Sequence, residues 1–287
     1  MDASPSELQR RFYAEEIEAA ANVKTAGLVE ALATVPRENF LPPGPWMLKS
    51  EADVGGPPRP TPDADPRRVN HNLAVSIDPT RLLFNGAPGL VSMLIDTLGL
   101  QAGDRVAHIG CGLGYYTALI AAVVGSTGRV VAIEVDDALA VGARVNLAST
   151  PWVEVVHGDA SGALAESFDA ILVNAGVTHP LNAWLDALAP GGRLVLPITV
   201  TMPAMGPVGK GIVMLLTRRG DTPSFDARAV TFVAIYTALG LRNESLNEAI
   251  GRALQRNPSP RLRRLRRDAH EPSAECWLHG DAFCFSL

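Results

Sequence analysis

Apolar and polar positions alternate along the middle of the chain in a pattern that predicts strands and helices in turn. Apolar runs of strand length lie at 106–109, 129–133, 153–157, 168–173 and 193–196. Helical spacing fills most of the intervals, at 90–98, 118–124, 138–148 and 181–188. Alternation of this kind is typical of a parallel sheet covered by helices on both faces. The predicted fold class is therefore α/β.

The segments on either side of this region have other patterns. Helical spacing with a cap at Ser6 predicts a helix over 6–34, which Pro36 ends. Residues 41–68 are rich in proline, glycine and aspartate, which predicts a long loop. Beyond Pro197, two strand-like runs separated by a polar turn predict an antiparallel closing pair. These runs are 211–217 and 227–235.

The last fifty residues read as an appendix to this sheet. They contain one amphipathic helix, over about 246–255, an arginine-rich run and a final apolar stretch. The arginine-rich run has no interleaved aromatic residues, so we interpret it as a solvated helix face rather than a site for RNA or an acidic peptide. Its members are Arg261, Arg263, Arg264, Arg266 and Arg267.

Three alternate glycines follow the first apolar strand and precede an apolar helix. Gly110, Gly112 and Gly114 permit positive φ and let a ligand approach the free N–H groups of a helix start. Twenty residues beyond Gly114, the next strand ends in Glu134, whose carboxylate can accept hydrogen bonds from ribose hydroxyls. This combination predicts a cofactor that contains adenosine.

The spacing of the glycines separates the candidate cofactors. A dinucleotide enzyme usually has G-x-G-x-x-G, whereas this chain has G-x-G-x-G. Asp159 follows the next strand and suits an adenine amino group. These features favour S-adenosylmethionine, and a nicotinamide enzyme is the alternative.

Composition narrows the remaining possibilities. The chain has 287 residues, 47% of them hydrophobic, which is enough for a full α/β core. Its formal net charge of −5 argues against a nucleic-acid surface. No apolar run is long enough to span a bilayer, the first residues do not resemble a signal peptide, and three cysteines do not suggest a disulfide scaffold. We therefore expect a cytoplasmic protein without a membrane partner.

Several motifs, in this order along the chain, resemble those of the protein L-isoaspartate O-methyltransferase family. The motifs are Val-Pro-Arg-Glu-Asn-Phe-Leu-Pro at 35–42, the glycine turn with Gly-Tyr-Tyr-Thr-Ala at 114–118, Gly-Asp at 158–159, and Gly-Gly-Arg-Leu-Val-Leu-Pro at 191–197. The resemblance implies a Rossmann-like, seven-stranded methyltransferase fold, S-adenosyl-L-methionine as cofactor and S-adenosyl-L-homocysteine as product. We expect an N-terminal helical and loop cap over 1–88, a methyltransferase core over 89–237 and a C-terminal extension over 238–287.

The resemblance also assigns residues to the cofactor. It implies that the three glycines line the cofactor, that Glu134 holds its ribose, and that Asp159 with Ala160 meets the adenine. We expect the neighbouring positions in the same motifs to contribute as well. These are His108, Cys111, Tyr115, Val135 and Asn174.

One position departs from the family pattern. Family members have a Ser-x-Pro motif, whose serine contacts the substrate carboxylate. Aligning Pro88 with the motif's proline places Gly86 where that serine is expected. Asn85 is the nearest polar side chain, and its amide can donate a hydrogen bond to a carboxylate. We expect Asn85, Gly86 and Pro88 to form the catalytic segment.

Three functions remain open at this stage. The first is methylation of a carboxylate in a peptide or protein. The second keeps the cofactor but acts on another carboxylate, in a tailored peptide or a small metabolite. The third is a recognition protein that binds the cofactor without catalysis.

Four possible zinc ligands lie near the end of the chain. They are His270, Cys276, His279 and Cys284. The segment has no paired C-x-x-C, and its aromatic residues suggest a buried strand, so we expect no metal.

Overall fold

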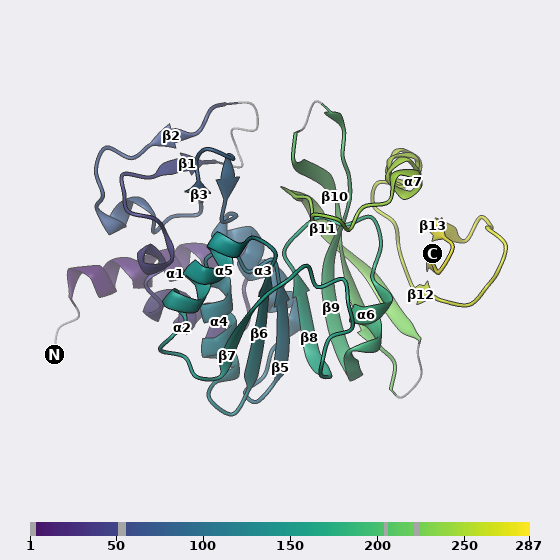
Figure 1. Cartoon of the computed structure of the whole chain (residues 1–287), viewed down its shortest axis with the longest axis horizontal. Helices are drawn as coiled ribbons and strands as arrows, with labels where there is room; N and C mark the ends of the chain where they lie inside the picture. The colour runs from purple at the N-terminus through teal and green to yellow at the C-terminus, as the bar shows by residue number, and fades with distance from the viewer. Residues whose placement is uncertain (1–3, 51–55, 204–205, 221–223) are drawn as a thin grey trace. The chain divides into compact units, whose positions relative to one another are not determined.

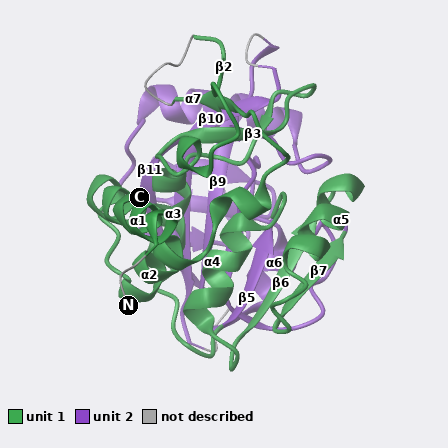
Figure 2. Ribbon diagram, turned by 90° about the vertical axis from the view of Figure 1, so that its left-hand side faces the viewer, with its two compact units in different colours: residues 1–104, 111–157 green, residues 105–110, 158–287 purple. Residues whose placement is uncertain are grey.

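The computed structural model describes residues 4–50, 56–203, 206–220 and 224–287 (Figure 1). The chain divides into two compact units (Figure 2). Unit 1 consists of residues 1–104 and 111–157, and unit 2 consists of residues 105–110 and 158–287. This division follows contacts within the chain, and the three domain boundaries expected from the sequence stay a prediction.

Unit 1 begins with two helices where the sequence predicted one. Helix α1 (Pro5–Ala21) starts at Ser4, whose hydroxyl accepts from the Glu7 N–H while the Glu7 carboxylate accepts from the Ser4 N–H. The helix ends at Asn22, which has a left-handed backbone (φ 52°), and α2 (Ala26–Thr34) follows. A single helix over 6–34 capped by Ser6 was therefore wrong, because the left-handed residue stops the first helix.

The rest of unit 1 alternates helices and strands. Its remaining helices are η1 (Arg37–Phe40), η2 (Pro66–Arg68), α3 (Pro88–Leu98), α4 (Tyr115–Val124) and α5 (Asp137–Asn146). Strands β6 (Arg129–Glu134) and β7 (Val153–His157) pair in parallel, as predicted. Helix α5 packs against both strands, and α4 packs against β6.

A small sheet takes in part of the region predicted to be a long loop. Its strands, in the order β2-β1-β3-β4, are β1 (Met47–Lys49), β2 (Arg59–Pro60), β3 (Ala74–Asp78) and β4 (Leu83–Phe84). The loop prediction was wrong for β1 and β2, which are short and pair antiparallel. Trp46, Val69 and Val75 form the core beneath them, with Leu41 and Leu48 packed against it.

Unit 2 is built on one sheet with the strand order β13-β14-β12-β11-β10-β9-β8-β5. These strands are β5 (Arg105–Ile109), β8 (Phe168–Val173), β9 (Leu188–Val200), β10 (Val208–Arg218), β11 (Phe225–Tyr236), β12 (Arg264–Arg266), β13 (Cys276–Gly280) and β14 (Phe283–Ser286). Strands β5, β8 and β9 are parallel, and β9, β10 and β11 are antiparallel. The predicted parallel strands and antiparallel closing pair are confirmed.

The C-terminal appendix extends this sheet. Its helix α7 (Glu244–Arg256) packs on β9, as does α6 (Asn182–Asp186), which precedes the appendix in the chain. The arginine-rich run contains β12, so its interpretation as a helix face was wrong. Strands β13 and β14 bury Trp277 and Phe285, as the aromatic pattern predicted. In the part of the chain that the structure describes, no helix has both the length and the apolarity that a membrane span requires.

Candidate functional site

The glycine turn adopts the left-handed backbone that its sequence predicts. The φ angles are 80° at Gly110, 57° at Gly112 and 94° at Gly114. A Cβ atom added to Gly114 would lie 2.8 Å from Cδ1 of Leu147, so this position lacks both the conformation and the space for a side chain. Helix α4 begins directly after Gly114 and presents its N-terminus at the turn.

Glu134 fixes this turn from the end of β6. One carboxylate oxygen accepts from the Gly112 N–H at 2.7 Å. The other accepts from the Val135 N–H at 3.0 Å and the Asp136 N–H at 3.1 Å. A carboxylate has about four acceptor positions, so these bonds leave about one for a ligand hydroxyl. Glu134 therefore shapes the turn in addition to its predicted contact with a ribose.

The residues after Glu134 connect the turn to the small sheet of unit 1. Asp136 caps α5 by accepting from the Leu139 N–H at 3.0 Å. Its other carboxylate oxygen pairs with Arg81, which also pairs with Asp78. Val135 is 38% exposed, so its side chain is available to a ligand.

The segment that carries Asn85 and Gly86 is held by several hydrogen bonds. The Asn85 side-chain oxygen accepts from the Val75 N–H at 3.0 Å and from Arg37 at 3.1 Å. The side-chain nitrogen of Asn85 is buried, and no described residue accepts a hydrogen bond from it. The Gly86 carbonyl accepts from the Tyr116 hydroxyl of α4 at 3.1 Å. The side-chain amide of Asn85 is thus oriented with its donor uncommitted.

Gly86 has a backbone that a serine adopts only with strain. Its φ is 79°, and an added Cβ would lie 3.1 Å from Cγ2 of Val91. Pro88 is the first residue of α3, where its missing N–H costs nothing. The next N–H, from Gly89, donates to the Asn72 side-chain oxygen at 2.8 Å. The start of α3 is therefore fixed immediately after the position where the family motif has serine.

Arg37 organises this region, and the sequence reasoning missed its role. Its side chain is buried, and its guanidinium donates to the carbonyl oxygens of Val69 at 2.6 Å, His71 at 3.1 Å and Leu73 at 2.8 Å, besides the bond to Asn85. The Val-Pro-Arg motif marked this arginine in the sequence. Three of its four partners are backbone carbonyls, however, and these leave no signal in the sequence.

Two further predicted residues are buried in unit 1. The Tyr115 hydroxyl lies 3.2 Å from that of Tyr13, and burial raises the pKa of Tyr115 well above its usual value. Burial also raises the pKa of the Cys111 thiol, and the charge of Glu134 adds to the effect. Cys111 is therefore a neutral thiol at the turn rather than a nucleophile.

The remaining predicted residues belong to unit 2. His108 lies within β5 with no exposed surface, and burial lowers its pKa to about 3. One Asp159 oxygen accepts from the backbone N–H of Ser161 at 2.9 Å and from its hydroxyl at 2.8 Å. Ala160 has a left-handed backbone (φ 53°). The Asn174 N–H donates to the Ile109 carbonyl at 2.8 Å, which places Asn174 at the end of β8.

Comparisons with known proteins agree with these motifs. A family model described as protein-L-isoaspartate(D-aspartate) O-methyltransferase matches residues 69–210. The protein-L-isoaspartate O-methyltransferase of Aeropyrum pernix is 35% identical over 202 residues, which make up 69% of each chain. That of Methylorubrum populi is 33% identical over 226 residues, covering 77% of this chain and 92% of the relative.

The chain belongs to the protein-L-isoaspartate O-methyltransferase family.

Solved structures support the fold of this family member. A structure titled protein-L-isoaspartate O-methyltransferase has a TM-score of 0.63 at 23% identity and covers 87% of this chain. A Plasmodium falciparum structure of the same description, in complex with S-adenosyl-L-homocysteine, has a TM-score of 0.59 at 15% identity and covers 80% of this chain. The predictions of the family, the α/β methyltransferase fold and S-adenosylmethionine dependence are confirmed.

Proposed function

We propose that this chain transfers a methyl group from S-adenosylmethionine to a carboxylate in a peptide or protein. The observation that carries the proposal is the set of hydrogen bonds from Gly112, Val135 and Asp136 to Glu134. They fix a carboxylate next to a left-handed glycine turn and a helix N-terminus, which suits the ribose and amino-acid parts of the cofactor. Three free cysteines are consistent with a reducing, cytoplasmic setting.

The described residues fit this cofactor. Near Gly112, an added Cβ would meet only Cδ1 of Ile77 within 4 Å, at 3.6 Å, so a ligand can approach the backbone there. Glu134 has about one acceptor position left for a ribose hydroxyl. Asp159 uses one oxygen for Ser161, and no described residue donates a hydrogen bond to the other. Hydrogen bonds from Ser161 lower the pKa of Asp159, so this carboxylate is ionised at neutral pH.

The chemistry requires positioning more than proton transfer. When bound, S-adenosylmethionine supplies a methyl group on a positively charged sulfur. The substrate carboxylate is already ionised at neutral pH, so the chain has no need of a general base. Asn85 is proposed to orient that carboxylate through its side-chain N–H, which has no described acceptor; because this nitrogen is buried, binding of the substrate has to uncover it. Alignment of two reactants contributes about 7–11 kcal/mol where the geometry is ideal.

A second candidate function is methylation of a different carboxylate, and Gly86 favours it. The serine that contacts the substrate carboxylate in the family pattern is missing here, and φ at Gly86 is 79°. The nearest donor is the longer amide side chain of Asn85, which starts one residue earlier. A donor at a different place and distance selects a carboxylate of different shape.

The test incubates the protein with labelled S-adenosylmethionine and an isoaspartyl peptide beside its aspartyl twin. Base-labile methyl ester on the isoaspartyl peptide alone would support repair-type activity. Label on neither peptide, with cofactor binding shown by calorimetry, would favour the second candidate and direct the search to other carboxylates. Failure to bind S-adenosylmethionine would refute both.

A further inference from the structure

The last eighteen residues of the appendix bring together four side chains that the methyltransferase site does not use. They are His270, Cys276, His279 and Cys284, and their ligand atoms all lie within 4.8 Å of one another. All four lie outside the region matched by the family model, residues 69–210. We propose that these residues bind one zinc ion in a closed Cys2His2 site that holds the C-terminal strands together.

One sulfur–nitrogen distance in this cluster matches tetrahedral coordination. Zinc bonds of about 2.3 Å to sulfur and about 2.0–2.1 Å to nitrogen place a sulfur and a nitrogen about 3.6 Å apart on a tetrahedron. The Cys276 sulfur lies 3.6 Å from Nε2 of His270. Thiolates are soft ligands and imidazoles are borderline ones, and this set favours zinc over magnesium or calcium. Four ligands from the protein leave no open position, so the site is structural.

The orientation of His270 is set by a bond of the kind seen around metal ligands. Its Nδ1 lies 2.9 Å from the Asp268 carbonyl oxygen and therefore carries the proton, which leaves the Nε2 lone pair directed at Cys276. The Ser273 N–H lies 3.4 Å from the Cys276 sulfur and donates to it. Nδ1 of His279 is buried, and no described residue forms a hydrogen bond with it.

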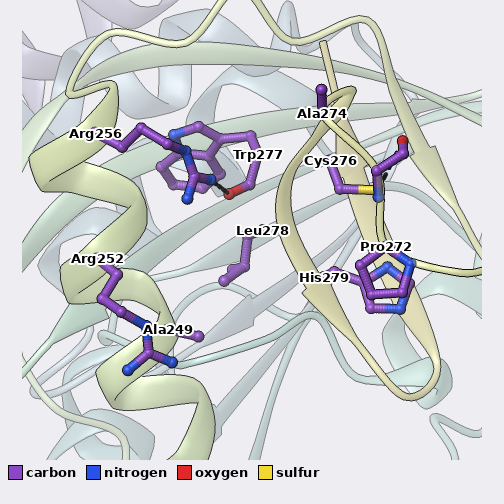
Figure 3. A pocket seen from close by; sticks show the side chains of 10 residues that line it. Ala249, Arg252, Arg256, Pro272, Ala274, Cys276, Trp277, Leu278 and His279 are labelled. Carbon is purple, nitrogen blue, oxygen red and sulfur yellow. Dashed lines mark hydrogen bonds between the residues drawn. The ribbon is translucent and has the colours of Figure 1, made fainter.

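A β-bulge explains how β13 supplies two proposed zinc ligands, Cys276 and His279, together with two buried side chains, Trp277 and Leu278. The register of β13 against β14 shifts between Cys276 and Leu278. Strict alternation would place Cys276 and His279 on opposite faces, and the bulge removes that constraint. Trp277 and Leu278 are each only 2% exposed. Figure 3 shows these two side chains toward α7, with Cys276 and His279 together on the other side.

The proposed ion would also hold in place one wall of a neighbouring hollow, the segment 272–279. This hollow, of about 460 Å³, lies between α7 and the segment 272–279 (Figure 3). Arg256 of α7 donates to the Trp277 carbonyl at 2.8 Å across it. The loop between β12 and β13 has little apolar burial of its own, because residues 271–275 are exposed. A metal cross-link would fix this loop where packing does not.

The experiment measures metal in the purified full chain after dialysis against a weak chelator. We expect about one zinc per chain by mass spectrometry of the elements, and strong visible absorption when cobalt replaces zinc, as for two thiolates on a tetrahedral ion. Cys276→Ser and Cys284→Ser should each lower zinc content at least about tenfold. His71→Ala, an exposed histidine of unit 1, should leave it unchanged.

The same measurements identify the outcomes that would overturn the proposal. Zinc that stays bound in both cysteine variants would place the metal elsewhere. Zinc-free protein that shows no cobalt spectrum and alkylates readily at both thiols would exclude the site. A Cys276–Cys284 disulfide, detected by mass without reduction, would replace the proposed metal with a covalent link. If a variant fails to fold, the cobalt spectrum of the wild-type chain still decides.

Discussion

Replacing Arg37 by alanine tests whether this arginine holds the segment that carries Asn85. The substitution removes four hydrogen bonds, of 2.6–3.1 Å. The Asn85 oxygen keeps the Val75 N–H and the His71 carbonyl keeps the Leu73 N–H, so the carbonyl oxygens of Val69 and Leu73 are the two acceptors left without a described donor. Each buried group left unsatisfied costs about 1–3 kcal/mol. Because such losses are not additive, we take the lower end of the sum for these two groups and expect local opening to become easier by about 2 kcal/mol.

Hydrogen exchange read by mass spectrometry gives the appropriate measurement. A change of about 2 kcal/mol corresponds to about thirtyfold faster exchange, since about 1.4 kcal/mol is tenfold. The effect should be concentrated in residues 69–85, which include the Val75 N–H that donates to Asn85. Arg37→Lys keeps the charge but lacks the planar set of donors, so it should lie between the wild type and Arg37→Ala.

A matched control separates this effect from loss of any arginine. Arg11 is exposed in α1 and pairs with Glu30 at 3.6 Å, so Arg11→Ala should change exchange little. Exchange of residues 69–85 in Arg37→Ala within about threefold of the wild type would refute the assigned role. Uniform acceleration across both units in Arg37→Ala, with no graded effect in Arg37→Lys, would mean that the arginine supports the whole fold instead.

Three further predictions concern single side chains. Gly86→Ser should lower the free energy of unfolding by about 1–2 kcal/mol, because φ is positive at this position. The same variant should show no higher activity on an isoaspartyl peptide, and a gain of activity in the labelling assay would contradict this expectation. Glu134→Gln places a side-chain N–H against a backbone N–H, so the affinity of the variant for S-adenosylhomocysteine, measured by calorimetry, should fall about ten- to hundredfold. The control variant Glu154→Gln, at an exposed position of β7, should bind this ligand as the wild type does. Burial lowers the pKa of His108 to about 3 in the folded chain, whereas in the unfolded chain His108 is protonated below about pH 6.5. The free energy of unfolding should therefore fall as the pH drops, by about 2 kcal/mol at pH 5. A denaturant series in which His108→Gln shows the same dependence of this free energy on pH would reject this cause.

The α/β core was predictable because its signals are local. Each parallel strand is an apolar run with a helix pattern beside it, and the glycine turn needs its glycines whatever surrounds it. Strands β1 and β2 were missed because they are three and two residues long and their partners are set by pairing rather than by their own pattern. The end of α1 at Asn22 was missed because asparagine also occurs within helices, so its presence in the sequence does not show that its backbone is left-handed.

The sequence offers a set of candidate site residues, which stays a prediction, but it does not give the contacts among them. Glu134 was predicted to be a ribose ligand, and its three bonds to backbone N–H groups could not be predicted from the sequence. The C-terminal ligands were recognised in the sequence and set aside because aromatic residues interrupt them. The bulge in β13, which reconciles buried aromatic residues with a ligand cluster, has no signature in the spacing.

The conformation of Gly86 bears on how substrate preference changes among related chains. Its carbonyl is engaged by Tyr116, and the preceding Asn85 is held by Arg37 and Val75. Glycine and serine at this position therefore favour different backbone conformations, so exchanging them changes more than the side chain. An exchange between them would require the loop to be rebuilt together with its anchors, so engineering a new carboxylate preference here calls for transplanting a segment instead of substituting one residue.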